Sequence, residues 1–264
     1  MTDVRTRNNV TEQGDLDGPV LLFAHGFGCD QSMWRFVVPH FTATHRVVLF
    51  DHVGLGSSDL SAFDPDRYAT LDGYAHDIVE ICDELGLTDV VLVGHSVSAV
   101  IGALAVAAAP ARFAGLVMVA PSPRYTDDVG YVGGLTDEDV AVLLESMEVN
   151  YVAWAHQTAP VIMGRPDVPA LGDELVDFFC RADPRIARHF ARVTFSSDNR
   201  GDLARVGVRT LVLQCRDDLL APDEVGEFVH RSIPGSTLVR LEARGHCPNL
   251  SAPEETAVAI REWL

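Results

Sequence analysis

Short segments that are almost entirely apolar recur along this chain, and they constrain its fold more than any other feature. Each is four or five residues long and ends at glycine or at a polar turn. They cover Val20–Ala24, Arg46–Phe50, Val90–Val93, Leu116–Ala120 and Thr210–Leu213. Segments of this length and composition are typical of strands buried on both faces of a parallel sheet.

Stretches with helical spacing of their apolar residues separate these strands. They cover Asp30–Phe41, Leu71–Leu85, Ser98–Ala109, Pro222–Ser232 and Pro253–Leu264. The last of them starts at proline, which is common in the first turn of a helix. Strands that alternate with helices predict an α/β fold with a doubly wound sheet.

The alternation stops after Ala120 and resumes only near Arg209. Four helical segments fill the gap: Thr136–Met147, Asn150–Val161, Glu174–Cys180 and Pro184–Phe195. We therefore expect a core formed by residues 1–120 and 196–264, with a helical insertion over residues 121–195. The connectors of the insertion are rich in turn-forming residues, so it can move relative to the core.

Charge and composition exclude several classes of protein. The chain of 264 residues has 20 basic and 38 acidic residues, a net charge of -18, which disfavours binding to nucleic acid or to an anionic membrane. All basic residues are arginine, which excludes Schiff-base chemistry on lysine, a pyridoxal-phosphate anchor and a P-loop. No pattern implies a metal or an organic cofactor.

Two further features concern the compartment. The five cysteines are scattered without a CxxC pair, as expected for reduced thiols. The first nineteen residues lack the apolar region of a signal peptide, and the longest strongly apolar stretch, Ala99–Ala109, is too short to span a bilayer. We expect a cytoplasmic protein.

The segment Val90–Ser98 reads VVLVGHSVS, an apolar strand that runs into Gly-x-Ser-x-Ser and then into an alanine-rich helix. A sharp strand-to-helix turn needs small residues around the serine, so that the strained backbone can form and the hydroxyl can stand clear of the sheet. The pattern predicts a nucleophile elbow at Ser96. Ser98 stands where the usual pattern has glycine.

A serine nucleophile needs a histidine base, which on such a sheet lies near the C-terminus. Of the ten histidines, only His246 lies between a short strand-like segment, Thr237–Leu241, and the last helix. His25 and His95 adjoin glycine turns, where packing against the backbone is the simpler interpretation. His246 is therefore the candidate base.

The acid that orients the base should follow the strand Thr210–Leu213. Asp217 and Asp218 both lie there, and spacing alone favours neither; each could instead cap the helix that starts near Pro222.

The oxyanion hole of such an elbow takes one N–H from the residue after the serine, Val97, and one from the loop after the first central strand. That loop reads HGFG, and its candidate donor is the N–H of Phe27.

Two other motifs resemble functional sites. The stretch Gly54–Asp59 lacks the third glycine of a dinucleotide-binding fingerprint, so a surface loop is the better interpretation. Cys247 adjoins His246, but sequence neighbours rarely face one another, and a buried small residue is expected there.

Several phrases together resemble the RsbQ-type bacterial stress-response hydrolases, which are related to the plant karrikin and strigolactone receptors. The phrases are GHSVS, HGFGCDQSMW, FDHVGLGSSD, YATLDGYAHDI, NYVAWA and LEARGHCPNLSAPEE. The similarity spans nearly the whole chain. At Ser98 the chain is like the plant receptors, whereas the bacterial regulators have glycine.

The resemblance implies an α/β-hydrolase fold, with a mostly parallel sheet and an inserted lid of four helices. It selects Asp218 over Asp217, which completes a triad of Ser96, Asp218 and His246 with an oxyanion hole at Phe27 and Val97. It also implies an apolar pocket, whose expected walls are Phe27, Tyr125, Trp154 and Phe195. For Trp154 and Phe195, packing within the insertion is an almost equal alternative.

Two functions follow as expectations. The first is a serine hydrolase that cleaves a small apolar ester or lactone without a cofactor, within stress-response signalling. The second is a ligand-sensing module that hydrolyses its ligand slowly and binds a regulatory protein, such as a phosphatase, through the lid. Sequence does not separate the two.

Overall fold

The structure of the protein is a computed structural model that describes residues 3–264. Seven strands form one sheet in the order β1-β3-β2-β4-β5-β6-β7. Their bounds are Thr11–Gly14 (β1), Val20–Ala24 (β2), Arg46–Phe50 (β3), Val90–His95 (β4), Phe113–Val119 (β5), Arg209–Arg216 (β6) and Thr237–Arg244 (β7). All neighbours pair in parallel except β1, which is antiparallel to β3.

The predicted apolar segments are all strands, and β4, the strand that leads to the elbow, lies at the centre of the sheet. Strands β2, β3 and β4 are buried along nearly their whole length. Burial on both faces explains why they carry no polar alternation.

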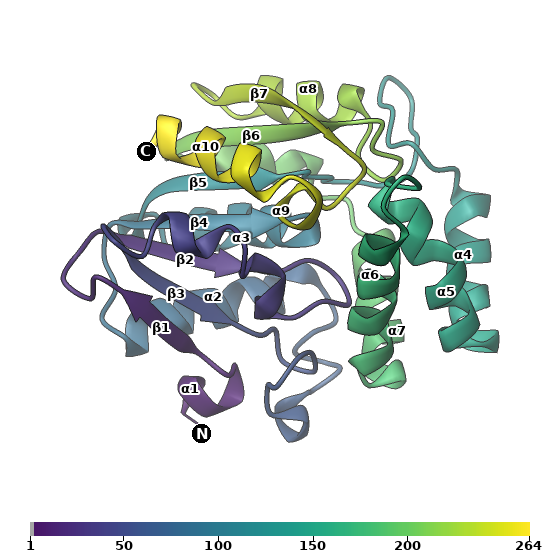
Figure 1. Ribbon diagram of the computed structural model, residues 1–264, viewed down its shortest axis with the longest axis horizontal. Helices are drawn as coiled ribbons and strands as arrows, with labels where there is room; N and C mark the ends of the chain where they lie inside the picture. The colour runs from purple at the N-terminus through teal and green to yellow at the C-terminus, as the bar shows by residue number, and fades with distance from the viewer. Residues whose placement is uncertain (1–2) are drawn as a thin grey trace.

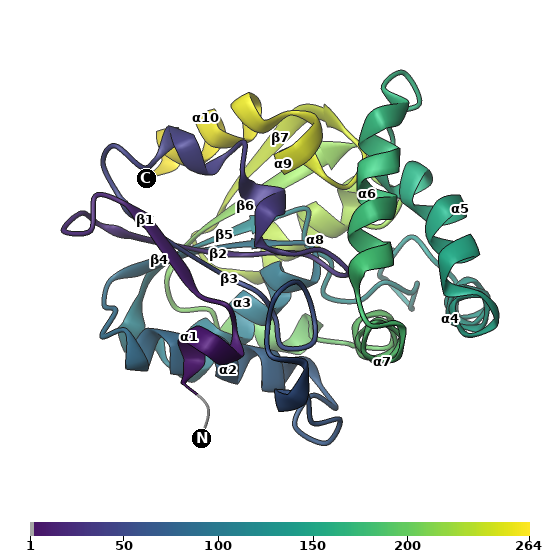
Figure 2. The ribbon, with the colours of Figure 1, turned by 60° about the horizontal axis from the view of Figure 1, so that its bottom comes forward.

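Helices cover both faces of this sheet. Outside the insertion they are Val4–Arg7 (α1), Leu71–Glu84 (α2), Val97–Ala108 (α3), Asp223–Ser232 (α8), Pro248–Ser251 (α9) and Pro253–Trp263 (α10). Helices α2 and α3 lie on one face, and α9 and α10 lie on the other (Figure 2). The doubly wound α/β sheet is confirmed.

Four helices lie between β5 and β6 in the chain: Asp137–Val149 (α4), Tyr151–Met163 (α5), Pro169–Arg181 (α6) and Pro184–Phe195 (α7). They group together at one end of the molecule, beyond the ends of the strands (Figure 1). Helix α6 begins at Pro169, five residues before the predicted start, because a proline is well placed in the first turn of a helix.

The predicted helix over Asp30–Phe41 is wrong. The structure has two short 3₁₀ turns there, Gln31–Trp34 and Val38–His40. Pro39 lacks a backbone N–H and disfavours helical geometry at the residue before it, so a continuous helix cannot pass.

Two other segments differ from expectation. Strand β1 was not predicted, because Thr11–Gly14 is polar and lies exposed at the sheet edge, where no apolar pattern is needed. The stretch Gly54–Asp59 is only partly a surface loop, since Gly54 and Leu55 are buried and Gly54 packs against Ile186 of α7.

Within residues 3–264, no helix is both long and apolar enough to cross a membrane.

Candidate active site

The backbone turns sharply at Ser96, between β4 and α3. Ser96 has φ 57° and ψ -126°, a conformation rare for a residue with a side chain. Its N–H donates to the carbonyl of Val119 on β5 at 2.8 Å, which ties the turn to the sheet. A Cβ on Gly94 would lie 2.3 Å from the carbonyl oxygen of Ser98, so the turn requires glycine there. The structure therefore has the strained elbow that the motif predicts.

The ring of His246 bridges the Ser96 hydroxyl and the Asp218 carboxylate. His246 Nε2 lies 2.6 Å from Ser96 Oγ, and Nδ1 lies 2.8 Å and 3.0 Å from the two oxygens of Asp218. All three side chains are buried. Because the Asp218 carboxylate accepts the proton on Nδ1, Nε2 is left as the acceptor for the hydroxyl hydrogen of Ser96.

Asp218, and not Asp217, reaches the ring. The Asp218 Oδ1 atom also accepts hydrogen bonds from the backbone N–H groups of Leu220 and Ala221, at 2.9 and 3.1 Å, which orient the carboxylate. The Asp217 side chain is 72% exposed and pairs with Arg244 at 3.4 Å. The geometry thus separates two aspartates that spacing alone could not.

The backbone of His246 is held from two sides. Its N–H donates to the carbonyl of Ile162 at the end of α5, at 2.9 Å. Its carbonyl lies 2.7 Å from Nε2 of His95, which donates to it. Burial lowers the pKa of His95 to about 3, so this ring stays neutral near pH 7. His95 therefore does more than pack against backbone, because it fixes the segment that carries the base.

Two backbone N–H groups beside Ser96 have no hydrogen-bond acceptor within the described part of the chain. They belong to Val97, at the first position of α3, and to Phe27, in the loop after β2. The first N–H groups of a helix have no acceptor within the helix, and the helix dipole favours negative charge there. The pair is suited to hold a negatively charged oxygen on a carbon attached to Ser96.

A small cavity of about 30 Å³ adjoins Ser96. Phe27, Tyr125, Trp154 and Phe195, the four residues predicted to form a pocket, all line it. Ser96 and His246 also line it, and the walls that sequence reasoning missed are Cys29, His95, Ile162, Leu175, Phe179, Thr194, Leu220 and Cys247. Leu175 and Phe179 are four residues apart on α6, a spacing that predicts a shared helix face but not what the face contacts.

Five of the fourteen residues that line the cavity are Phe, Tyr or Trp, and several of their rings pack around Phe27. The Phe27 ring lies 5.8 Å from Phe179, 6.1 Å from Phe195 and 6.2 Å from Trp154, measured between centroids. Phe27 therefore joins the oxyanion loop to helices α5, α6 and α7. Burial raises the pKa of Tyr125, so its phenol is neutral at pH 7.

Three residues that line the cavity have a buried polar atom without a hydrogen-bond partner in the described part of the chain, and one of these atoms is Nδ1 of His95. The other two atoms are Thr194 Oγ1 and Trp154 Nε1. Leaving such groups unpaired is costly, so they are suited to bind a polar atom of a molecule in the cavity.

The cysteines near the site are not nucleophiles. Burial raises the pKa of Cys247 and of Cys29, which keeps both thiols protonated at pH 7. Cys247 is buried, as the sequence suggested. Within the described residues, no group of His, Cys, Asp or Glu is arranged to hold a metal ion.

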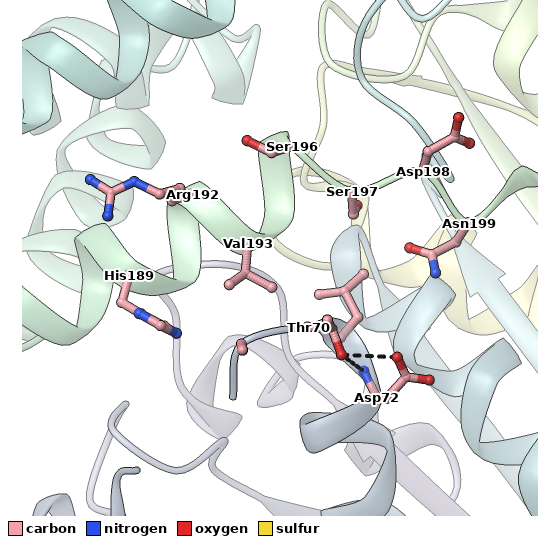
Figure 3. A pocket seen from close by; sticks show the side chains of 11 residues that line it. Thr70, Asp72, His189, Arg192, Val193, Ser196, Ser197, Asp198 and Asn199 are labelled. Atoms are coloured by element: carbon pink, nitrogen blue, oxygen red, sulfur yellow. Dashed lines mark hydrogen bonds between the residues drawn. The ribbon is translucent and has the colours of Figure 1, made fainter. Parts of the chain in front are cut away.

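A larger hollow, of about 450 Å³, lies between α7 and the start of α2 (Figure 3). Its lining includes His189, Arg192 and Asp198, but neither Ser96 nor His246. Thr70 and Asp72 in this hollow hydrogen-bond to each other at the cap of α2. The smaller cavity is the one that Ser96 and His246 line.

Comparison with known proteins agrees with this geometry. A model of the alpha/beta hydrolase family matches residues 21–259. The chain belongs to the alpha/beta hydrolase family. Its strigolactone esterase relative from Arabidopsis thaliana, D14, is 41% identical over 93% of this chain and 92% of the relative. The karrikin insensitive 2 receptor CA of Petunia hybrida is 39% identical over 95% and 93%.

A solved hydrolase from Oleispira antarctica superposes with a TM-score of 0.96 at 38% identity, covering 99% of this chain and 96% of that one. The predicted kinship with the plant receptors and the predicted α/β-hydrolase fold are confirmed. As an α/β hydrolase the chain is an enzyme, and two curated relatives at 41% identity are named esterases.

Proposed function

We propose that this hydrolase cleaves a small apolar ester or lactone through an acyl-enzyme on Ser96. The observation that carries the proposal is the 2.6 Å contact between Ser96 Oγ and His246 Nε2 at a strained elbow. Asp218 on the far nitrogen sets the tautomer that makes Nε2 a base.

In the first step, Ser96 Oγ attacks the ester carbonyl carbon and His246 Nε2 takes the hydroxyl proton. The carbonyl oxygen becomes an oxyanion, which the N–H groups of Phe27 and Val97 stabilise; each such donor is typically worth about 3 kcal/mol of the barrier. The intermediate collapses, the C–O bond to the leaving group breaks, and His246 gives that oxygen its proton. For a lactone, the leaving alcohol remains attached to the acyl group.

In the second step, a water attacks the acyl-enzyme while His246 takes a proton from it. The second oxyanion uses the same two donors. Ser96 then leaves with the proton from His246, and the carboxylic acid is released. Every proton passes through one nitrogen, so the reaction needs no cofactor.

The cavity supports the substrate class. Aromatic and aliphatic side chains form most of its walls, so an ionised substrate would lose its hydration without a partner. The net charge of -18 also disfavours anions. The Thr194 hydroxyl and the Trp154 indole N–H, which have no partner in the described protein, can hydrogen-bond to a neutral polar group of the substrate away from the reacting carbonyl.

Residues 121–195 act in this proposal as a lid on a core of residues 1–120 and 196–264. A cavity of about 30 Å³ holds roughly one or two waters, whereas pockets for small ligands usually measure about 300–1,000 Å³. Helices α4–α7 must therefore shift before a substrate enters.

The test is multiple-turnover hydrolysis of p-nitrophenyl acetate by the wild type and by Ser96→Ala. We expect the variant to lose turnover while its circular dichroism and unfolding midpoint stay close to the wild type. Ser58→Ala, which removes a buried hydroxyl outside the site, is the matched control and should keep its rate. A wild-type rate in Ser96→Ala would exclude this serine.

The second candidate function is a ligand sensor in which slow hydrolysis alters the lid and so controls binding of a regulatory protein, such as a phosphatase in a stress response. It is favoured by the 39% identity to a relative named as a receptor. A single turnover followed by a lasting change in lid protease sensitivity would support it. Steady multiple turnover would favour the first function.

A further inference from the structure

Ser98, which replaces the usual glycine of the elbow, makes two hydrogen bonds inside the core. Its side chain is fully buried in the first turn of α3. Its Oγ lies 2.5 Å from the carbonyl oxygen of His25 and 2.7 Å from Nε2 of His52. His25 is the first residue of the loop that holds Phe27, so this hydroxyl joins the elbow to that loop.

The direction of each hydrogen bond follows from the atoms. The His25 carbonyl can only accept, so it takes the single hydrogen of the Ser98 hydroxyl. His52 Nε2 must then donate to Oγ. The other nitrogen of His52, Nδ1, is buried without a partner among the described residues, and in the neutral Nε2–H tautomer it carries no hydrogen that would need an acceptor. The three groups form an ordered chain from His52 through Ser98 to His25.

The same chain orients the peptide that carries one oxyanion donor. His25 Nε2 accepts the backbone N–H of His52 at 3.0 Å, so its Nδ1 carries the hydrogen and donates to the carbonyl of Gly26 at 2.9 Å. That carbonyl and the N–H of Phe27 belong to one planar trans peptide, so they point in opposite directions. Fixing the Gly26 oxygen therefore fixes the Phe27 N–H.

We propose that Ser98 is a positioning residue of the oxyanion hole: its hydroxyl holds the Phe27 donor at a set distance from the Val97 donor. Val97 directly precedes Ser98 in α3, and the Ser98 hydroxyl contacts the loop two residues before Phe27. The inference rests on the proposed acyl transfer, because an oxyanion hole matters only if an oxyanion forms.

Glycine at position 98 would give the usual motif. It would also leave two buried groups without a hydrogen-bond partner, the backbone carbonyl of His25 and the ring Nε2–H of His52. Unpaired buried groups are costly, and the loop can relieve that cost by moving. Displacement of a reacting group by about 1 Å can lower a rate by about a hundredfold. Ser98 is thus more than a tolerated substitute for glycine.

The test compares Ser98→Gly and Ser98→Ala with the wild type on p-nitrophenyl acetate. Both variants should lower kcat by about ten- to a hundredfold, with KM changed by less than about threefold. The inhibition constant of an aryl trifluoromethyl ketone, whose hemiketal on Ser96 has an oxyanion, should rise by the same factor as kcat/KM falls. A purely structural role would not produce that parallel.

Thr256→Val is the matched control, because Thr256 is equally buried in α10 and donates to the carbonyl of Ala252 at 3.0 Å, outside the site. It should keep the wild-type kcat. His52→Leu removes the ring N–H that donates to Ser98 and should also lower kcat. If the Ser98 variants do not fold, the kcat of His52→Leu tests the inference instead.

A wild-type kcat in Ser98→Gly overturns the inference. An inhibition constant that stays unchanged while kcat falls also overturns it, and so does a fall in kcat of Thr256→Val equal to that of the Ser98 variants. If Ser96→Ala is inactive while Ser98→Gly is fully active, only the inference fails. If Ser96→Ala retains turnover, the proposed function itself fails.

Discussion

At the scale of single residues, the role of Asp218 is the most sharply testable part of the site. Asp218→Asn keeps the shape of the side chain but can donate to Nδ1, which favours the wrong tautomer of His246. By analogy with other triads we expect kcat to fall about 10⁴-fold. Steady-state kinetics with p-nitrophenyl acetate as substrate measure this fall in kcat.

Asp217→Asn is the matched control for that variant, since Asp217 is the exposed neighbour that pairs with Arg244. It should keep a rate within about twofold of the wild type. If Asp217→Asn is the damaged variant and Asp218→Asn is not, the acid has been assigned to the wrong residue.

Buried neutral histidines predict how stability depends on pH. Burial lowers the pKa of His25, His52 and His95, in the last case to about 3. The unfolded chain, with histidine pKa values of about 6.5, binds more protons than the folded chain below that pH. The stabilisation is therefore complete above pH 6.5 and is lost as the pH falls.

Each of these histidines should contribute up to about 1.4 kcal/mol of unfolding free energy per pH unit below pH 6.5. Urea unfolding between pH 6.5 and 5 measures the slope before most carboxylates titrate. His52→Gln should reduce the slope by about one histidine's share, whatever its effect on stability at pH 7. An unchanged slope would show that His52 takes up its proton equally in the folded and the unfolded protein, and would contradict the lowered pKa.

Sequence motifs predicted which residues lie together where a local turn positions them. Ser96 and Val97 follow from one strand-to-helix turn, and His246 follows from its place before the last helix. The choice of Asp218 needed resemblance, because adjacent aspartates differ only in how the loop directs them. Ser98 and His52 lie 46 residues apart, and nothing local predicts their contact.

At the scale of elements, the end of α5 and the loop that carries the base pack through two glycines. A Cβ on Gly164 would lie 2.7 Å from Gly245 Cα, and His246, the next residue, donates to the Ile162 carbonyl of α5. The position of the insertion is thereby coupled to the position of the base.

Gly164→Ala should therefore lower both stability and kcat. Gly86→Ala is its control, because Gly86 has a nearly equal φ, 63° against 64°, but has nothing within 4 Å of an added Cβ. A left-handed alanine alone costs about 1–2 kcal/mol, which is what we expect for Gly86→Ala, with kcat unchanged. Equal unfolding free energies and equal kcat values in the two variants would contradict the coupling.

Buried strands were predicted from the sequence more accurately than exposed ones. Strands β2 and β3 have the predicted bounds because an apolar run is required wherever both faces are covered. Strand β1 is polar and exposed, so its sequence has no apolar pattern from which its pairing with β3 could be predicted. The stretch Asp30–Phe41 has helical spacing but forms only two short 3₁₀ turns. Pro39 lies in the second turn and has no N–H to donate to the carbonyl of Arg35, as a continuous α-helix would require.

At the scale of the whole molecule, the small volume of the cavity, about 30 Å³, predicts a preference for short acyl chains. The wild type should hydrolyse p-nitrophenyl acetate faster than the octanoate, measured as kcat/KM, because the longer chain requires a larger displacement of α4–α7. Leu175→Ala enlarges the cavity and should narrow that ratio, at a cost of about 2–5 kcal/mol in stability.

Leu203→Ala is the control for lost packing, since Leu203 is fully buried but does not line the cavity. It should cost similar stability and leave the acetate-to-octanoate ratio unchanged. If the acetate-to-octanoate ratio shifts equally in both variants, then a general loss of packing, and not the size of the cavity, sets the preference for short acyl chains.

The central claim is that a carbonyl carbon becomes bonded to the Ser96 oxygen. Mass spectrometry of the protein, quenched in acid during turnover of p-nitrophenyl acetate and then digested, tests it most directly. We predict an added acetyl mass on the peptide that contains Ser96 and no such adduct in Ser96→Ala. Steady turnover with no acyl group on that peptide, or with the adduct on another side chain, would contradict the mechanism.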